Sequence, residues 1–244
     1  MLSKEFLGAA AATSIMCVSA EATVTNYRAD LQDINNLGAS GVATLAFDDV
    51  SNQLQVNIAA SGLDADQVHV AHIHGRSDSA GNPIDSVTPD ISVDEDGDGF
   101  IELAEAAPSY GPILLGLSMP AGLDPLGSEG GFSTAPGGAI NFSFLYDLNA
   151  DIFFGGADVS DLTPLFLREI VIHGAFVGAA GDGTGGEVNG VAGYKPTLPA
   201  LVGEISEVPL PAASALFLAG LAGLPLFRKS RSRKNRRRPP LLST

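Results

Sequence analysis

The four histidines are His69, His72, His74 and His173, and their spacing suggests a transition-metal site. His72 and His74 are two residues apart, so on a strand their side chains share one face. His173 ends the apolar run Ile170–Ile172. If the two strands are neighbours in the right register, His72, His74 and His173 meet on one face of a sheet. Imidazole nitrogens are ligands for zinc and copper, so these three residues are candidate ligands. The alternative is that they are hydrogen-bonding residues at strand ends.

A second candidate site is an acidic stretch of twelve residues, 94–105. A hard cation needs six to eight oxygen ligands, and this spacing directs several carboxylates to one point, with Gly99 permitting a sharp turn. The stretch resembles the EF-hand calcium loop at positions 1, 3, 5, 6, 7, 9 and 12. This resemblance implies a calcium site formed by Asp94, Asp96, Asp98, Phe100 (through its carbonyl), Glu102 and Glu105. The alternative is an ordinary acidic surface loop.

The residues that flank this loop do not predict a paired, regulatory EF-hand. Pro89 disfavours a helix before the loop, so we expect 87–93 to be extended. After the loop, only a short helix of about 103–107 fits before Pro108. We therefore expect one calcium loop inserted in a β-domain, where the ion orders a segment that its own charges would otherwise hold open.

The elements that must position these residues are predicted to be strands. Apolar and polar residues alternate in 42–47, 54–58 and 140–146, as is typical of half-buried strands. No long amphipathic helix is evident in 23–207, and glycine-rich loops are expected, notably at 126–138 and 178–190. We therefore expect an all-β protein with an antiparallel, Greek-key-like β-sandwich and long glycine-rich loops.

Several of these segments resemble the CHRD domain, a module named after chordin and also found in secreted bacterial proteins. The resemblance rests on the 41–47 and 54–58 strands, Ser61-Gly62-Leu63, Ala71-His72-Ile73-His74-Gly75, the strand ending at His173, and Gly186-Glu187-Val188-Asn189-Gly190. It covers 23–205 and is densest in the first third. It implies an extracellular β-sandwich module without catalytic activity.

The histidine pattern is also similar to the copper ligands of copper–zinc superoxide dismutase. Carried over, His72, His74 and His173 would match three of those ligands. The chain departs from that family because a bridging histidine, the zinc-binding loop and the disulfide are missing. With one cysteine and no tryptophan, the sequence also excludes a disulfide scaffold and a multi-cysteine metal site.

Charge is divided unevenly along the 244 residues. The formal net charge is −15, but eight of the 13 basic residues lie in 228–238. The segment 23–207 holds four basic and 26 acidic residues, a net charge of −22. Such a surface attracts cations and repels nucleic acids and anionic lipids, so the central domain is not expected to bind nucleic acid.

The two ends of the chain read as targeting segments. Residues 1–22 have Lys4, an apolar stretch and small residues before a cleavage point, which predicts a secretory signal peptide that contains the only cysteine, Cys17. Residues 208–227 carry no charge and are long enough for a transmembrane helix, and the basic residues 228–244 are expected to stay in the cytoplasm.

The C-terminal pattern Val208-Pro209-Leu210-Pro211-Ala212-Ala213, followed by an apolar segment and arginines, resembles the PEP-CTERM sorting signal of Gram-negative bacteria. This resemblance implies export across the inner membrane and recognition by an exosortase. The protein would then be membrane-anchored, at the cell surface or in the extracellular matrix, with exopolysaccharide or a matrix protein as a possible neighbour.

Together, these features predict a secreted, surface-sorted, calcium-stabilised module with a binding or matrix role and no catalysis. Its domains would be a signal peptide at 1–22, a CHRD-like domain at 23–207, a transmembrane sorting helix at 208–227 and a basic tail at 228–244. Two alternatives use the histidines. One is a copper- or zinc-binding protein that stores metal without turnover, and the other is a superoxide-dismutase-like enzyme.

Overall fold

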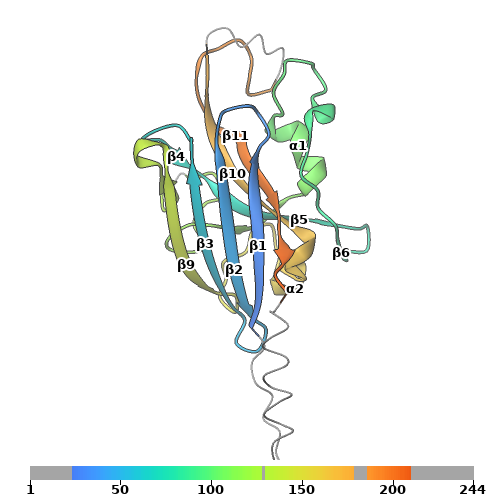
Figure 1. The fold of residues 1–244 in the computed structure, drawn as a ribbon. Helices are drawn as coiled ribbons and strands as arrows, with labels where there is room; N and C mark the ends of the chain where they lie inside the picture. The colour runs from blue at the N-terminus through green and yellow to red at the C-terminus, as the bar shows by residue number, and fades with distance from the viewer. Residues whose placement is uncertain (1–23, 128–129, 179–185, 210–244) are drawn as a thin grey trace, which may run out of the picture.

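The computed structural model describes residues 24–127, 130–178 and 186–209 (Figure 1). Antiparallel strands dominate these residues and helices are few, which confirms the all-β prediction. The expected signal peptide, nearly all of the expected membrane helix and the basic tail lie outside the described residues. Within the described ranges, no helix combines the length and hydropathy needed to span a bilayer.

The main sheet follows the strand order β6-β5-β10-β11-β1-β2-β3-β9, and all its pairings are antiparallel. Figure 1 shows β9, β3, β2 and β1 side by side, with β5 and β10 crossing behind them. The front strands are β1 (Val24–Asp33), β2 (Ser40–Asp48), β3 (Gln53–Ser61) and β9 (Ile140–Asp147).

The remaining strands complete the side that carries the histidines. β1 joins β11 through only two registered pairs, Gln32↔Val202 and Asp33↔Leu201, so the sheet changes direction there. β7 pairs with β5, and β12 pairs with β1. A separate two-stranded sheet joins β4 to β8. The bounds are β4 (Val68–His69), β5 (Ala71–Ser77), β6 (Pro83–Ile84), β7 (Ile113–Gly116), β8 (Ser133–Thr134), β10 (Arg168–Val177), β11 (Gly193–Glu204) and β12 (Ser206–Glu207).

The alternating segments form the strands that the sequence predicts. In β3, buried and more exposed residues alternate over the whole strand, from exposed Gln53 and buried Leu54 to exposed Ser61. The inward residues of the front strands join those of β5, β10 and β11 in one hydrophobic cluster. β10 differs because nearly every residue on both its faces is buried. A strand covered on both faces can hold a polar side chain away from water, and this one carries His173.

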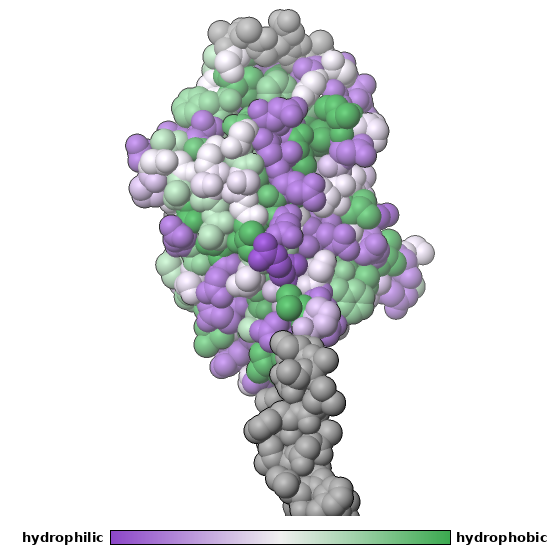
Figure 2. Space-filling view, in the orientation of Figure 1, coloured by the Kyte–Doolittle hydropathy of each residue, from purple (hydrophilic) through white to green (hydrophobic). Residues whose placement is uncertain are grey.

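The outer face of the front strands is exposed to solvent. Figure 2 shows it as a patchwork of hydrophilic and intermediate residues in which apolar side chains form small patches. The alternation therefore divides these strands into a buried face and a solvated face.

The helices are short, and one of them corrects the sequence-based expectation. α1 (Leu103–Tyr110) continues three residues past the predicted end at about 107 and includes Pro108. Proline removes one backbone donor from the helix, and this eight-residue helix still forms because Ala106 and Tyr110 are buried against the sheet. The other helical segments are η1 (Ile91–Val93), η2 (Pro136–Gly138), α2 (Val159–Leu162) and η3 (Leu165–Leu167). η1 interrupts the stretch 87–93 that was expected to be extended.

Candidate metal centre

The register between β5 and β10 brings three histidines together. Val171 pairs with His72, and Glu169 pairs with His74. Directly paired residues point to the same face, so His72, His74, Val171 and Glu169 share one face of this sheet. His173 follows on β10, where its backbone N–H donates to the carbonyl of Val70 at 2.8 Å. The two histidine strands are therefore neighbours, which is the condition under which the sequence places the three histidines together.

Each imidazole of this triad (His72, His74 and His173) is anchored through one nitrogen to a backbone carbonyl. His72 Nε2 donates to Pro125 at 2.7 Å, His74 Nδ1 to Gly111 at 2.8 Å and His173 Nδ1 to Thr197 at 2.7 Å. A carbonyl oxygen only accepts, so each of these ring nitrogens carries the proton. The other ring nitrogen of each neutral imidazole must then carry a lone pair.

The three histidine rings converge. One nitrogen from each histidine lies within 4.8 Å of those of the other two. His72 Nδ1, His74 Nε2 and His173 Nε2 are buried and have no hydrogen-bond partner. The residues are only 1%, 2% and 2% exposed, respectively. In a tetrahedral zinc site with bonds of 2.0–2.1 Å, ligand nitrogens are about 3.3 Å apart, which small side-chain adjustments would reach.

Burial keeps these imidazoles neutral at physiological pH. Removal from water lowers the pKa of His74 to about 3 and that of His173 to about 4. The pKa of His72 is also well below its usual value, through burial and the proximity of the other two rings. Metal ions bind the neutral form of histidine, so protons do not compete for the lone pairs near neutral pH.

His69 shows what a structural histidine looks like in this fold. It is fully buried, and both of its ring nitrogens lie beside backbone carbonyls, Nδ1 at 3.0 Å from that of His173 and Nε2 at 3.1 Å from that of Asp64. A neutral ring has one N–H and can donate to one of these two carbonyls, and His69 is not part of the group of converging histidines. The structure therefore separates His69 from the triad, a distinction that the sequence did not make.

Two aromatic rings border the triad. The ring of Phe132 lies 5.5 Å from that of His72, and the ring of Tyr110 lies 4.6 Å from that of His74. Tyr110 ends α1, and the next residue, Gly111, supplies the carbonyl that holds His74. The sequence analysis did not identify Tyr110. Its position at the end of a short helix gave no signal, because its contact with His74 is set by the packing of α1.

Glu169 is a buried acid on the same face that the sequence analysis also missed. It is fully buried, Oε2 accepts a hydrogen bond from Thr88 Oγ1 at 2.9 Å, and Oε1 has no partner. Burial raises the pKa of this carboxyl to about 8. The sequence did hold a signal for this acid, because a residue two positions before Val171 and four before His173 lies on their face in a regular strand.

Arg168, the residue before Glu169, has a structural role. Its guanidinium is buried and donates to five backbone carbonyls, those of Arg76, Asp161, Leu162, Ile84 and Leu167. A Cβ on Gly75 would lie 2.7 Å from Arg168 Cδ and 2.5 Å from a methyl group of Leu114. The glycine that follows the two histidines is thus needed for the arginine to pack beside their strand.

The acidic loop brings three of the expected calcium ligands together. One oxygen each from Asp94, Asp96 and Glu105 lies within 4.8 Å of the others. Asp98 is not part of that group, although its Oδ2 is buried and lacks a hydrogen-bond partner. Within the loop, Asp94 accepts from the backbone N–H groups of Gly97 and Gly99, so its carboxylate already closes the turn.

Glu102, expected as the ninth-position ligand, is not in the group of converging oxygens and is bonded to the backbone. It is 4% exposed, and its Oε1 accepts from the backbone N–H of Val188. A Cβ at Gly186 would overlap this carboxylate. Glu187 accepts from the N–H of Leu103 and from the hydroxyl of Thr197, whose carbonyl holds His173. The segment 186–188 therefore connects the end of the acidic loop with the strand that anchors one histidine.

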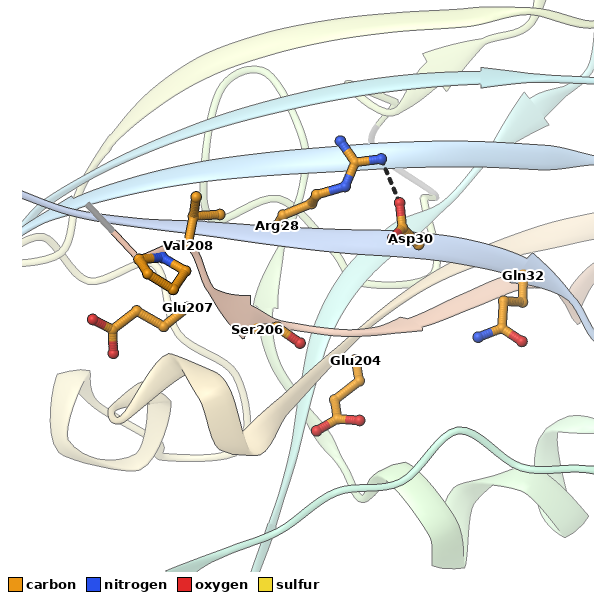
Figure 3. Close-up of a pocket in the computed structure, with 8 residues that line it drawn as sticks. Arg28, Asp30, Gln32, Glu204, Ser206, Glu207 and Val208 are labelled. Atoms are coloured by element: carbon orange, nitrogen blue, oxygen red, sulfur yellow. Dashed lines mark hydrogen bonds and ion pairs between the residues drawn. The ribbon is translucent and has the colours of Figure 1, made fainter. Parts of the chain in front are cut away.

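A surface groove of about 350 Å³ lies beside β1 and β12, close to where the described chain ends at Pro209 (Figure 3). Arg28 and Asp30 form an ion pair of 2.5 Å across its edge, with side chains 48% and 70% exposed. Exposed pairs of this kind contribute little to stability or recognition. The groove is open and mixed in charge, with lining residues Arg28, Asp30, Gln32, Glu204, Ser206, Glu207, Val208 and Pro209.

Comparison with known proteins leaves the function open. No protein-family model matches the chain, and a search of curated proteins finds no match.

Proposed function

We propose that this protein binds a transition metal, zinc or copper, through His72, His74 and His173. The observation that supports the proposal best is a triad of buried histidines that each have one unpartnered ring nitrogen and of which one nitrogen per ring lies within 4.8 Å of those of the other two. The second nitrogen of each ring is held by a carbonyl. This arrangement is the one that fixes metal-binding histidines in proteins, because it sets both the tautomer and the orientation of the ring.

The alternative, that the histidines serve only to hold the fold together, accounts poorly for the free nitrogens. A buried polar atom without a partner costs about 1–3 kcal/mol, and here three such atoms lie together. His69, in the same sheet region, places both of its ring nitrogens beside carbonyls and is not part of the converging group. A bound metal would give all three free nitrogens a partner at once.

We propose binding rather than turnover. A dismutase-like centre would use a histidine that bridges two metals, and His69, the fourth and last histidine of the chain, lies outside the converging group with its nitrogens directed at backbone carbonyls. The triad is also almost completely shielded from solvent. Superoxide dismutation remains the alternative, and its assay is part of the test below.

We further propose a structural calcium ion in the acidic loop and export to the cell surface. The convergence of oxygens from Asp94, Asp96 and Glu105 supports the first proposal, with Asp98, the Phe100 carbonyl and Glu102 as the other sequence-predicted ligands. The second rests on the sequence of residues 1–22 and 208–244. As part of this same proposal, the chain is a CHRD module with a Greek-key-like sandwich. It is recognised by an exosortase and contacts exopolysaccharide or a matrix protein.

Metal analysis of the purified full chain tests the triad. After chelation, addition of Zn²⁺ or copper should restore one ion per chain and raise the melting temperature. At a free metal concentration of 100 times the dissociation constant, the expected stabilisation is about 2.7 kcal/mol. His72→Gln and His173→Gln should remove both effects, whereas the matched control His69→Gln should keep them.

Either of two results would contradict the proposal. One is a chain that gains no stability from either metal, and the other is stoichiometric binding that survives both triad substitutions. Superoxide turnover that follows copper content would replace the binding role with the enzymatic alternative.

A further inference from the structure

The number and charge of the triad's ligands decide which metal ion the site prefers. The triad offers three nitrogens, all from neutral imidazoles. Among the described residues, no carboxylate or thiolate joins them within 4.8 Å of all three. The only cysteine, Cys17, lies in the predicted signal peptide. A metal bound here therefore receives three donors and no negative charge from the ligand set.

Burial makes the charge of the ion decisive. The histidines are 1–2% exposed, and the electrostatic cost of moving an ion out of water grows with the square of its charge. A divalent ion therefore pays about four times the cost of a monovalent ion of similar size. Neutral ligands add no negative charge that would lower this cost, so burial favours a monovalent ion over a divalent one.

Zn²⁺ would also need a fourth ligand. Zinc sites with three protein ligands complete a tetrahedron with water or substrate. Here the rings of Phe132 and Tyr110 border the triad at 5.5 and 4.6 Å from their nearest histidine rings. The Phe132 ring offers a bound water no hydrogen bond, and of these two side chains only the buried, unpartnered hydroxyl of Tyr110 could hold one. Copper in its monovalent state, by contrast, is stable with three nitrogen ligands in a plane.

Glu169 is a buried acid that could reverse this preference. It is paired with His74 across the sheet and shares the triad's face. However, one of its oxygens is bonded to Thr88, and it is outside the group of converging atoms. In this geometry Glu169 does not act as a fourth ligand.

We infer that the His72–His74–His173 centre is a three-coordinate site for Cu(I), and that it binds Cu(I) in preference to Cu(II) and Zn²⁺. The inference rests on the proposed function, since it presumes that the triad binds metal. It adds the oxidation state and coordination number of the ion. A protein with this preference would take up copper as the reduced ion.

The test compares the three ions on the metal-free full chain. Cu(I) is titrated without oxygen against a chromophoric Cu(I) chelator, and Cu(II) and Zn²⁺ are titrated against their own competitors. X-ray absorption then counts the ligands. We expect one Cu(I) with three nitrogen neighbours and no oxygen neighbour. A hundredfold preference for Cu(I) over Cu(II) would raise the reduction potential by about 120 mV above that of free copper in the same buffer.

Glu169→Gln tests whether the buried acid is a metal ligand, and His69→Gln is the matched histidine control. Both variants should keep the Cu(I) affinity and the three-nitrogen coordination. The Cu(I) inference is wrong if Zn²⁺ or Cu(II) binds more tightly than Cu(I), or if the metal has an oxygen ligand that Glu169→Gln removes. In those cases the triad remains a metal centre. If none of the ions binds, or if His173→Gln leaves binding unchanged, the proposed function itself fails.

Discussion

Lowering the pH should destabilise the metal-free protein through the triad. In the unfolded chain, histidines titrate near pH 6.5. In the folded protein, His74 titrates at about 3 and His173 at about 4. Between these limits the unfolded state binds protons that the folded state does not, so stability is complete above about pH 6.5 and is lost as the pH falls. At pH 5 each of the two histidines should cost about 2 kcal/mol relative to pH 8, and His72 acts in the same direction.

Glu169 changes the stability in the opposite direction as the pH falls, so its contribution must be removed before the histidine effect is measured. Its pKa is raised from 4.5 in the unfolded chain to about 8. The folded state therefore holds a proton that the unfolded state releases, and this contribution weakens as the pH rises from 4.5 to 8. In the native chain, part of the histidine effect is hidden by this carboxyl. The measurement is best made in the Glu169→Gln variant, where only the histidines titrate strongly in this range.

Urea unfolding of metal-free Glu169→Gln at pH 8, 7, 6 and 5 gives the assay. The free energy of unfolding should fall by about 4 kcal/mol or more between pH 8 and 5. Adding His173→Gln should reduce that fall by about 2 kcal/mol, because one titrating group is gone. A free energy that changes by less than about 1 kcal/mol over the whole range would refute the argument that these imidazoles are buried in the neutral form.

Three further predictions concern other buried or clustered charges. Glu169→Gln should be more stable than the native chain at pH 8, and the difference should be about 1.4 kcal/mol for each pH unit above 4.5. The urea midpoints of the two chains should therefore coincide near pH 4.5, and a difference that stays constant with pH would contradict the raised pKa of Glu169. Arg168→Met should cost more than about 3 kcal/mol in urea unfolding because five carbonyls lose a donor, and a loss below about 1 kcal/mol would show that water replaces it. Calcium at 100 times its dissociation constant should stabilise the full chain by about 2.7 kcal/mol. Asp94→Ala should abolish that shift and the control Asp78→Ala should not; equal shifts in both variants would place calcium elsewhere.

The local pattern of the sequence was sufficient for the strands. In β3 and β9, apolar residues recur at every second position, and a strand places those residues on one face, so their burial follows from the period alone. The same parity put His72 and His74 on a common face. The end of α1 was not predictable in this way. Pro108 signals a stop, but the burial of Tyr110 two residues later extends the helix.

The acidic loop shows where motif-based reasoning reached its limit. Its spacing correctly brought oxygens of Asp94, Asp96 and Glu105 together, because these positions lie within one compact turn and the start of one helix. The motif also assigned Glu102 to the ion. In the structure Glu102 is held by the N–H of Val188, 86 residues away along the chain. A contact of that kind depends on a distant segment, which a twelve-residue pattern cannot describe.

The sequence by itself determined the strands, the charge division and the residue types of both candidate sites. Only the tertiary structure decided which histidines form the triad and which nitrogens are free. The register Val171↔His72 brings the third ring across the sheet, and the carbonyls of Pro125, Gly111 and Thr197 fix the proton on the outer nitrogen of each ring. Periodicity is a property of neighbouring residues along the backbone. The ring tautomers depend on carbonyls that are 24 to 53 residues away along the chain. Only packing brings those carbonyls and the paired strands into place.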